Sequence, residues 1–531
     1  MTRQDRIDQL KSTEFDVLII GGGITGVGVA LDAASRGLSV ACIEMQDFAG
    51  GTSSKSTKLI HGGLRYLKQF DFALVHEVGT EREVVHKNAF HLVHPEKMLL
   101  PIYKQSEYSK FFTKVGLSIY DWLANVDPAD RHRMLSAEET IAHEPLLKKT
   151  DLLGAGYYAE YRTDDARLVI AVGRTAEQYK AVLLNHCKAV SFDFAKQRLN
   201  AVNCLDLMGA EEFTIKAKTI VNAAGPWVDQ LRLLDMTDEG KKLHLTKGVH
   251  IVVDHKRFPV KQSVYFDIPD GRMMFAIPRE GKTYIGTTDT DFRADPVKPY
   301  ANLDDVSYIV NSLSQVFPDT RLQVKDIESS WAGLRPLIQE SGKSASEISR
   351  KDELFVSKSG LISIAGGKLT GYRKMAEKTV NQVMKQLGKK ASSKTKSLKL
   401  YGNRFNKYSE VAAYCTQLAD SFKRSLKETT YLVQRYGSDA ESILESAKKI
   451  DGQMPLLMAE LDYCIDHEWI ERATDFIDRR SGRLYFQFKE LEKISGLILL
   501  RMRERKSWSD ERYQDEKNHL NTIIRKVSVF S

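Results

Sequence analysis

A glycine-rich turn near the N-terminus is the part of this 531-residue sequence whose chemistry is most specific. Gly21, Gly23 and Gly26 follow an apolar run, Val17 to Ile20, and Glu44 stands roughly 20 residues beyond the turn. In such a pattern the first glycine permits a tight turn, the second lets the backbone approach a pyrophosphate, and the third lets a helix pack on a strand. The acid accepts hydrogen bonds from a ribose. The spacing therefore predicts a dinucleotide site.

A strand, a helix and a second strand must surround this turn. The apolar residues Phe15 to Ile20 predict the first strand, a helix then runs to about Gly37, and Leu38 to Ile43 form the second strand. A phosphate would lie at the positive N-terminus of the helix. Flexible turns often resemble a lone glycine motif, but here strand, helix, second strand and terminal acid are in register, which favours a βαβ unit.

Two later strands are expected to return to the same sheet. Thr219 to Gly225 and Leu361 to Gly367 both end in small residues, which let the backbone lie against a flat ring. Gly366 and Gly367 precede a helix beginning at Tyr372, whose N-terminus would direct positive partial charge at the pyrimidine edge of a reduced flavin. The glycine turn alone suits NAD as well as FAD. Because the βαβ unit and both returning strands would contribute to one sheet, we favour a firmly held FAD.

The remaining elements are less regular. We predict helices over Asp71 to Phe90 and Asp165 to Asn185, with a strand over Gly154 to Arg162 between them. Strands dominate between His244 and Arg335, which suggests an antiparallel sheet that forms a wall over a ligand. A Lys- and Ser-rich linker, Gly388 to Lys396, precedes a region that is helical throughout.

Composition narrows the class of protein. The chain is 42% hydrophobic, which is typical of a folded protein. Its five cysteines include no CxxC pair, which argues against a disulfide framework and against a zinc or iron–sulfur site. We therefore predict no metal. We expect no secretory signal and no spanning helix, because no uncharged apolar segment approaches about 18 residues. Most of the net charge of +8 lies after Lys389, which suits an anionic partner or simply a soluble surface.

Eight segments together resemble the FAD-dependent glycerol-3-phosphate dehydrogenase family, and the resemblance covers nearly the whole chain. They are Gly21 to Gly26, Thr52 to Ser54, Lys58 to Tyr66, Asp164 to Leu168, Ala224 to Trp227, Gly286 to Asp289, Gly333 to Leu337 and Gly366 to Thr370. The resemblance implies a fold of class α/β plus all-α: a Rossmann-like FAD-binding domain, an antiparallel-sheet substrate domain as in D-amino-acid oxidase, and a C-terminal helical domain.

The expected domains are interleaved along the chain. Residues 1–98, 152–240 and 335–388 would form the FAD-binding domain, residues 99–151 and 241–334 the substrate domain, and residues 397–531 the helical domain.

The resemblance also implies the reaction. The enzyme would oxidise sn-glycerol 3-phosphate to dihydroxyacetone phosphate, with hydride transfer to FAD and electrons passed to membrane quinone. The alternative is a glycerol-3-phosphate oxidase, which reduces oxygen to hydrogen peroxide. Relatives of the streptococcal oxidase type carry a long insertion where this chain has only residues 338–355, which favours the dehydrogenase.

Two further alternatives belong to other classes. A flavoprotein whose C-terminal module binds RNA is disfavoured, because the basic residues there are interspersed with Asp and Glu and no stacking-aromatic motif accompanies them. We therefore expect no nucleic-acid partner. Oxidation of an amino acid on the same fold is disfavoured because several cations suit a dianionic phosphate better than a zwitterion.

The substrate requires fixed positive charge near its phosphate and a proton acceptor near its alcohol. Arg65, Arg335 and Lys368 are the expected phosphate ligands, because arginine forks match phosphate geometry. Arg350 is a weaker candidate, and Tyr66 and Thr288 complete the expected substrate contacts.

Histidine is the usual proton acceptor near neutral pH. We assign His250 as the base and His61 to the lining of the flavin, and we expect Arg335 and His61 to belong to the catalytic set as well. The alternative for either histidine is a hydrogen-bonding role against the backbone. Cofactor contacts are expected from Gly21, Gly23, Gly26, Glu44, Thr52, Ser53, Lys58, His61, Gly225, Gly366, Gly367 and Lys368.

A quinone-reducing enzyme must touch the bilayer. Lys104 to Trp122 interleaves basic and aromatic residues, as suits a short helix at an anionic lipid surface, although the same pattern fits an amphipathic helix packed on its own protein. We expect a cytoplasmic protein, peripheral on the inner face of the cell membrane. The sequence leaves the oligomeric state open, with a homodimer as one alternative.

Overall fold

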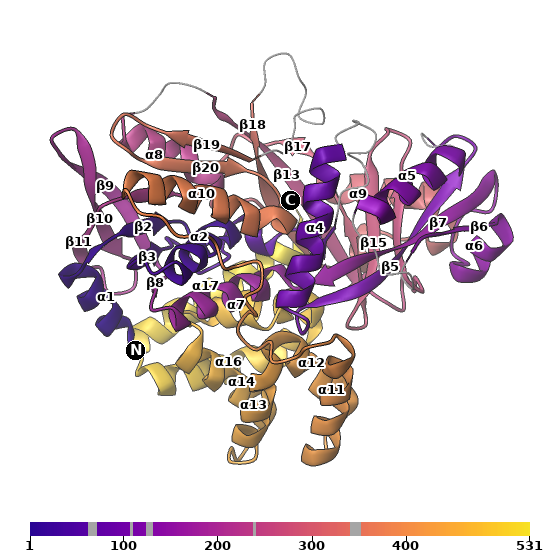
Figure 1. Ribbon diagram of the computed structural model, residues 1–531. Helices are drawn as coiled ribbons and strands as arrows, with labels where there is room; N and C mark the ends of the chain where they lie inside the picture. Colours follow the sequence, from indigo (N-terminus) through magenta and orange to yellow (C-terminus); the bar gives the residue numbers. More distant parts are fainter. Residues whose placement is uncertain (62–71, 107–109, 124–130, 237–240, 340–351, 531) are drawn as a thin grey trace.

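The computed structural model describes the whole chain except residues 62–71, 107–109, 124–130, 237–240, 340–351 and 531 (Figure 1). Three sheets make up its first two thirds, and the C-terminal helices lie against them on one side.

A six-stranded sheet carries the N-terminal glycine turn. Its order is β19 (Asp352–Val356), β20 (Ile362–Gly366), β12 (Ile220–Asn222), β2 (Val17–Ile20), β3 (Val40–Ile43) and β8 (Val182–Leu184). All neighbours are parallel except β19, which is antiparallel to β20. The predicted returns of the chain to one sheet are therefore confirmed, since β12 pairs with β2 and β20 pairs with β12.

Both faces of this sheet are covered, which explains why β2 and β3 are apolar along their whole length. The helices α2 (Ile24–Ser35), α7 (Asp165–Gln178) and α10 (Tyr372–Gln386) share a core with one face. The helix α1 (Arg3–Ser12) and a four-stranded sheet share a core with the opposite face. The strand order of that second sheet is β1 (Glu14–Phe15), β11 (Glu212–Ala217), β10 (Arg198–Asp206) and β9 (Cys187–Ala195).

The predicted helix over Asp165 to Asn185 is too long. The helix ends at Gln178, and Lys180 adopts a left-handed backbone with φ of 68°. Residues 182–184 then pair with β3 as the edge strand β8. Apolar residues after the turn satisfy a helical and an extended pattern equally well, so the periodicity did not reveal the break.

The third sheet contains the strands predicted between His244 and Arg335, and it extends to strands between residues 59 and 163. It is antiparallel, as expected, except that β14 pairs in parallel with β5. Its ten strands in the described part of the chain run β17-β13-β16-β15-β14-β5-β7-β4, with β18 paired to β13 and β6 to β7. The bounds are β4 (Leu59–Ile60), β5 (Val93–Tyr103), β6 (Arg133–Leu135), β7 (Leu152–Thr163), β13 (Leu243–Asp254), β14 (Ser263–Asp267), β15 (Met273–Arg279), β16 (Lys282–Gly286), β17 (Thr290–Asp291) and β18 (Ile327–Ile338). Strands β5 and β7 lie at the expected domain boundaries near residues 98 and 152, and both pair within this sheet.

Five further helices lie between the strands of these sheets in the described part of the chain. They are α4 (Phe72–Asn88), α5 (Lys110–Leu123), α6 (Ala137–His143), α8 (Val228–Leu234) and α9 (Leu303–Val316). The predicted helix within Lys104 to Trp122 begins at Lys110. Its residues Thr113 and Leu117 are buried, whereas Phe111 and Phe112 are both 69% exposed.

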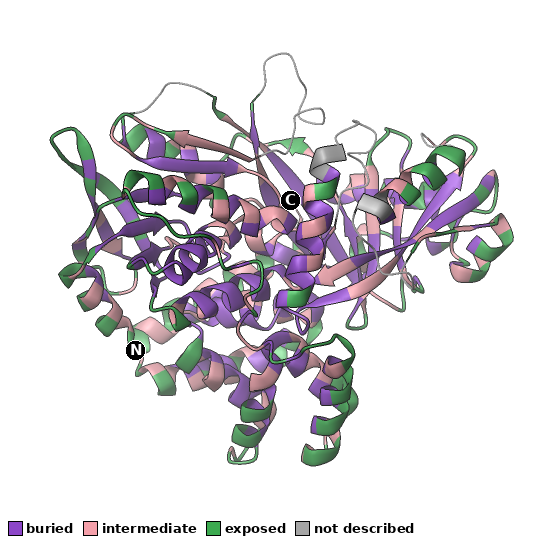
Figure 2. Ribbon diagram, viewed as in Figure 1, coloured by how far each residue is buried: buried purple, intermediate pink, exposed green. Residues whose placement is uncertain are grey.

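The C-terminal region is helical, as predicted. It comprises α11 (Ser409–Phe422), α12 (Leu426–Tyr436), α13 (Ala440–Ala447), α14 (Pro455–His467), the π-helical turn η8 (Asp475–Arg480), α15 (Arg483–Phe486), α16 (Leu491–Lys506) and α17 (Asp510–Ser528). Its apolar residues form one core with Met98, Tyr284 and Trp331 of the ten-stranded sheet. Exposed residues gather on the protruding α11 and α13 (Figure 2).

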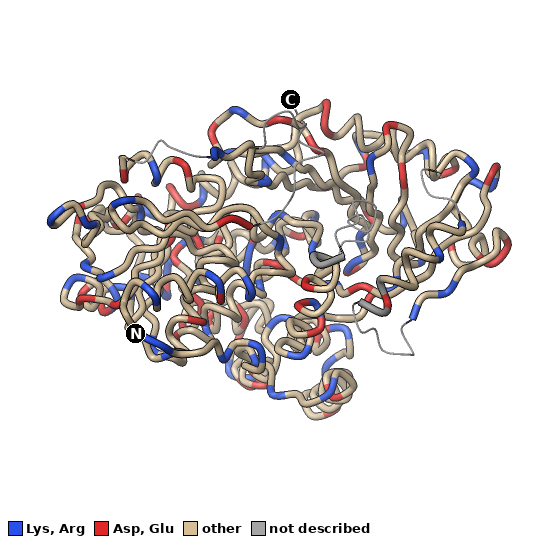
Figure 3. The backbone as a smooth tube through the Cα atoms, turned by 45° about the horizontal axis from the view of Figure 1, so that its top comes forward, with Lys and Arg blue, Asp and Glu red and all other residues tan. Residues whose placement is uncertain are grey.

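Lys and Arg positions are interspersed with Asp and Glu positions along the backbone (Figure 3). Among the described residues, no helix combines the length and apolar character that a crossing of the bilayer requires.

Candidate active site

A cavity of about 410 Å³ opens where β2, β12 and β20 end. Most of the cofactor residues predicted from the sequence line it, in the order Gly21, Gly23, Glu44, Thr52, Ser53, Gly225, Gly366, Gly367 and Lys368. Parallel strands bring their carboxyl ends to one sheet edge, which is where ligands of such sheets bind.

The glycine turn fits a pyrophosphate. A Cβ on Gly21 would lie 2.5 Å from the Ala223 oxygen, and one on Gly26 would lie 1.8 Å from the Gly21 oxygen, so both positions require glycine. Gly23, at the N-cap of α2, meets only the Ser53 side chain, whose Oγ lies 3.0 Å from the position of the absent Cβ. The positive end of α2 therefore faces an open cradle, which is the arrangement that holds the phosphates of FAD.

Glu44 holds the turn in shape. Its Oε2 accepts a hydrogen bond from the Gly22 amide at 2.6 Å, and its Oε1 accepts one from the Gln46 amide at 2.8 Å. Loss of water around the carboxyl raises its pKa. Ser53 accepts a hydrogen bond from the Ile24 amide at 2.9 Å, and Thr52 donates one to the Leu334 oxygen at 2.7 Å. These side chains order the backbone of the cavity in addition to lining it.

The other end of the cavity is built from glycines with left-handed backbone. Gly225, Gly366 and Gly367 have φ of 54°, 77° and 79°. A Cβ on Gly367 would also lie 2.3 Å from Sδ of Met375. Lys368 follows them and lines the cavity. This backbone can lie close to the flat ring of a flavin.

The strand β18 connects this cavity to a second group of side chains. Pro336 lines the cavity, and Arg335 and Trp331 of the same strand pair with Thr246 and His250 of β13. Two glycines clear the space: a Cβ on Gly248 would lie 2.3 Å from Arg335 Nη2, and one on Gly286 would lie 2.3 Å from His250 Cδ2.

Arg335 is held by the segment after β16. Its Nη1 donates to Asp289 Oδ1 at 2.9 Å, and its Nη2 donates to Thr287 Oγ1 at 3.0 Å. The guanidinium is thus fixed across β13, which Gly248 permits.

His250 is buried and stacks on Trp331, with ring centroids 4.9 Å apart. Its Nε2 lies 3.0 Å from Thr57 Oγ1, and its Nδ1 has no hydrogen-bond partner within the described part of the chain. Burial, with the nearby cations Arg335 and Lys58, lowers the pKa of this imidazole well below its ordinary value. The ring is therefore held in its neutral form.

Three predicted residues take other positions. Lys58 forms a buried ion pair with Asp165, and with His61 it lies outside the cavity lining in the described structure. Thr288 directs its hydroxyl to the β13 backbone, where it accepts from the Val249 amide at 3.0 Å. The His61 carbonyl accepts a hydrogen bond from Thr370, 3.1 Å away.

Arg65, Tyr66 and Arg350 lie outside the described residues, so their predicted role as substrate ligands stays a prediction.

Thr57, Trp331, Gly248 and Gly286 were not predicted from the sequence as site residues. Gly248 stands two residues before His250, and Gly286 stands one residue before Thr287. A glycine inside a predicted strand near a candidate base was the available signal, because such a glycine often marks a close approach of other groups. Thr57 and Trp331 carried no such signal, because only tertiary pairing brings them to His250.

Comparison with known proteins agrees with this geometry. A family model described as FAD dependent oxidoreductase matches residues 16–373, and one described as the C-terminal domain of alpha-glycerophosphate oxidase matches residues 393–513. An aerobic glycerol-3-phosphate dehydrogenase of Bacillus subtilis (strain 168) is 46% identical over 98% of this chain and 96% of its own. One of Staphylococcus aureus (strain MRSA252) is 48% identical over 91% and 89%.

Solved structures show the same fold. The X-ray structure of the glycerol-3-phosphate dehydrogenase from Bacillus halodurans, complexed with FAD, is 40% identical, with a TM-score of 0.86 over 99% of this chain and 98% of that one. The FAD-bound L-alpha-glycerophosphate oxidase of Mycoplasma pneumoniae is 18% identical, with a TM-score of 0.57 over 72% of this chain and 97% of its own, and supports the fold alone.

Proposed function

Because this chain belongs to the FAD-dependent glycerol-3-phosphate dehydrogenase family, we propose that it oxidises sn-glycerol 3-phosphate to dihydroxyacetone phosphate and passes the electrons to a membrane quinone. The proposal rests mainly on a fixed guanidinium, Arg335, that acts electrostatically on a neutral buried imidazole, His250. The two residues lie on the paired strands β18 and β13, of which β18 reaches the FAD cavity through Pro336.

The two side chains would divide the work. Arg335 presents a planar fork to the phosphate dianion, and Lys368 adds a second positive charge from the cavity wall. When bound, FAD supplies the acceptor for the hydride that leaves carbon 2. His250 takes the proton of the carbon 2 hydroxyl, so that the alcohol becomes a ketone with no change in the phosphate.

Replacement of the base tests this division. His250→Gln should lower kcat by about 10²- to 10⁴-fold, the contribution of a general base, with little change in KM. His255→Gln is the matched control, because His255 lies just beyond the far end of β13 and contacts Thr283. An unchanged kcat in His250→Gln would remove this residue from the reaction.

The electron acceptor needs its own test. The short segment of residues 338–355, where oxidases of the streptococcal type carry a long insertion, supports the dehydrogenase over the oxidase. After reduction by substrate, we expect a quinone analogue to restore the flavin colour much faster than oxygen does. Faster reoxidation by oxygen, with hydrogen peroxide formed, would favour the oxidase instead.

We propose that α5 is the contact with anionic lipid on the inner face of the membrane. Phe111 and Phe112 project into solvent beside the exposed Lys110 and Lys114, as suits a helix lying at the headgroup boundary. The double variant Phe111→Ser, Phe112→Ser should no longer cosediment with phosphatidylglycerol vesicles at low salt. Leu426→Ser, which removes an apolar side chain 54% exposed on α12, is the control. Equal sedimentation of all three proteins would contradict this contact.

A further inference from the structure

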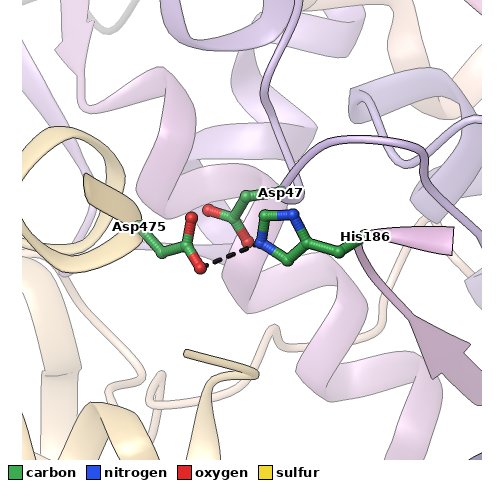
Figure 4. A group of neighbouring side chains, drawn as sticks. All are labelled: Asp47, His186 and Asp475. Atoms are coloured by element: carbon green, nitrogen blue, oxygen red, sulfur yellow. Dashed lines mark hydrogen bonds and ion pairs between the residues drawn. The ribbon is translucent and has the colours of Figure 1, made fainter. Parts of the chain in front are cut away.

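A buried charged cluster joins the helical domain to the FAD-binding domain. Asp47, His186 and Asp475 bring their ligand atoms within 4.8 Å of one another, at a spacing that would suit a metal ion (Figure 4). The carboxylates already have guanidinium partners, however. Asp47 pairs with Arg479 and Arg480, and Asp475 pairs with Arg479 and lies 3.0 Å from Nε2 of His186. Two guanidinium groups at this distance would repel a cation, so the cluster is a connection between domains.

Asp47 stands in a segment, residues 44–54, that forms one wall of the FAD cavity. Glu44 and Ser53 bind the amides of Gly22 and Ile24, and the Ala49 amide donates to the Gly22 oxygen at 3.1 Å. The glycine turn is therefore bonded to this segment at three points. A displacement of the segment would change the cradle in which the pyrophosphate lies.

The helical domain supplies most of the partners of Asp47. Arg480, fully buried, donates through both terminal nitrogens, with Nη2 at 2.8 Å from Oδ1, and Arg479 donates through Nε at 2.6 Å to Oδ2. Asn185 of the FAD-binding domain donates at 2.9 Å. Both arginines end the π-helical turn η8, a rare geometry that is often found at functional sites.

An aromatic contact follows the same route. Phe48, next to Asp47, packs its ring edge against Trp469 of the helical domain, with centroids 4.9 Å apart. The same ring borders Gly22, where a Cβ would lie 2.4 Å from Phe48 Cδ1. The Phe48 ring thus lies between Trp469 of the helical domain and the glycine turn, and contacts both.

We propose that Arg479 and Arg480 are positioning residues for FAD, which act through Asp47 on the segment that walls the cofactor cavity. The helical domain is then part of the cofactor site, although none of its residues lines the cavity in the described structure. The proposal concerns FAD affinity and does not depend on which alcohol is oxidised.

The test is the affinity of the full-length holoenzyme for FAD, followed by recovery of flavin fluorescence after dilution at a temperature well below unfolding. Arg479→Gln should raise the dissociation constant by about tenfold, equivalent to about 1.4 kcal/mol. The double variant Asp47→Asn, Arg479→Gln should have an FAD dissociation constant less than about twofold above that of Asp47→Asn alone, because the two residues act through each other.

Glu280→Gln is the matched control. It removes another ion pair between the helical domain and a sheet, with Arg435 at 2.8 Å, that does not touch residues 44–54. We expect this variant to lose thermal stability yet keep the wild-type dissociation constant. The proposal is overturned if Arg479→Gln behaves in the same way. If Arg479→Gln does not fold, Asp47→Asn alone carries the test, and a wild-type FAD affinity in that variant overturns the proposal equally.

Discussion

Two glycines decide where the reacting side chains lie. Gly248 leaves room for the Arg335 guanidinium to cross β13, and Gly286 leaves room for the His250 ring. Neither has the left-handed backbone that would itself exclude alanine. A methyl group at either position therefore acts through the side chain that it displaces.

Gly248→Ala should weaken the binding of substrate. The added Cβ would push the guanidinium away from Asp289 and Thr287, and loss of a hydrogen bond to a charged group costs about 1.5–3 kcal/mol, so KM should rise by roughly 10- to 100-fold. Steady-state kinetics provide the measurement. Gly496→Ala in α16, where no neighbouring atom lies within 4 Å of the new Cβ, should leave KM unchanged. A wild-type KM in Gly248→Ala would contradict a role of Arg335 in binding the substrate phosphate.

At the scale of elements, three buried histidines gather where α4 and β5 meet the start of α11. Burial is the main cause that lowers their pKa, to about 4 for His86 and about 3 for His91, and well below the ordinary value for His94. His94 lies 3.3 Å from the Tyr408 hydroxyl and faces Arg162, while His86 lies near Arg82. All three are neutral in the folded protein.

The unfolded chain should therefore take up more protons than the native one below pH 6.5. The stabilisation from neutral His86 is complete above that pH and is lost as the pH falls towards about 4. Urea unfolding at a series of pH values measures this effect. His86→Gln should reduce the loss of stability on acidification by up to roughly 3 kcal/mol. An identical pH dependence in the variant and the wild type would contradict a buried neutral imidazole.

Some of the helices and strands could be predicted from the sequence, and others could not. The glycine turn and the returning strands β12 and β20 were predictable, because their signals are local: glycine spacing, apolar runs and small residues at strand ends. The break at Lys180 was missed, because a non-glycine residue takes the left-handed backbone there. The strands β10 and β11 could be predicted from the sequence, but the separate sheet that they form with β1 could not, because residues about 200 positions apart pair in it. The partners of His250 depend on the same kind of distant pairing.

At the scale of the whole molecule, the helical region does not stand apart from the sheets. It shares a core with the ten-stranded sheet, and Arg167 of α7 forms a buried ion pair with Glu468 beyond α14. Removal of one partner of such a pair leaves an uncompensated charge. FAD release and loss of helical structure should therefore occur in one transition.

Glu468→Gln tests this cooperativity. It should destabilise the protein by about 3–5 kcal/mol and still leave flavin fluorescence and far-ultraviolet circular dichroism with coincident melting curves. Glu504→Gln, whose side chain is 68% exposed and pairs with Arg501, should cost less than about 1 kcal/mol. Separate transitions for the helices and the flavin would contradict a shared core.

The proposed reaction requires a substrate that carries both an alcohol to oxidise and a phosphate for the cationic side chains to bind. The most direct measurement is the visible absorption of the purified flavoprotein, mixed without oxygen with sn-glycerol 3-phosphate or with glycerol. We predict that the phosphate ester bleaches the yellow flavin and that glycerol at the same concentration does not. A flavin that stays oxidised with sn-glycerol 3-phosphate, yet is bleached by dithionite, would contradict the account.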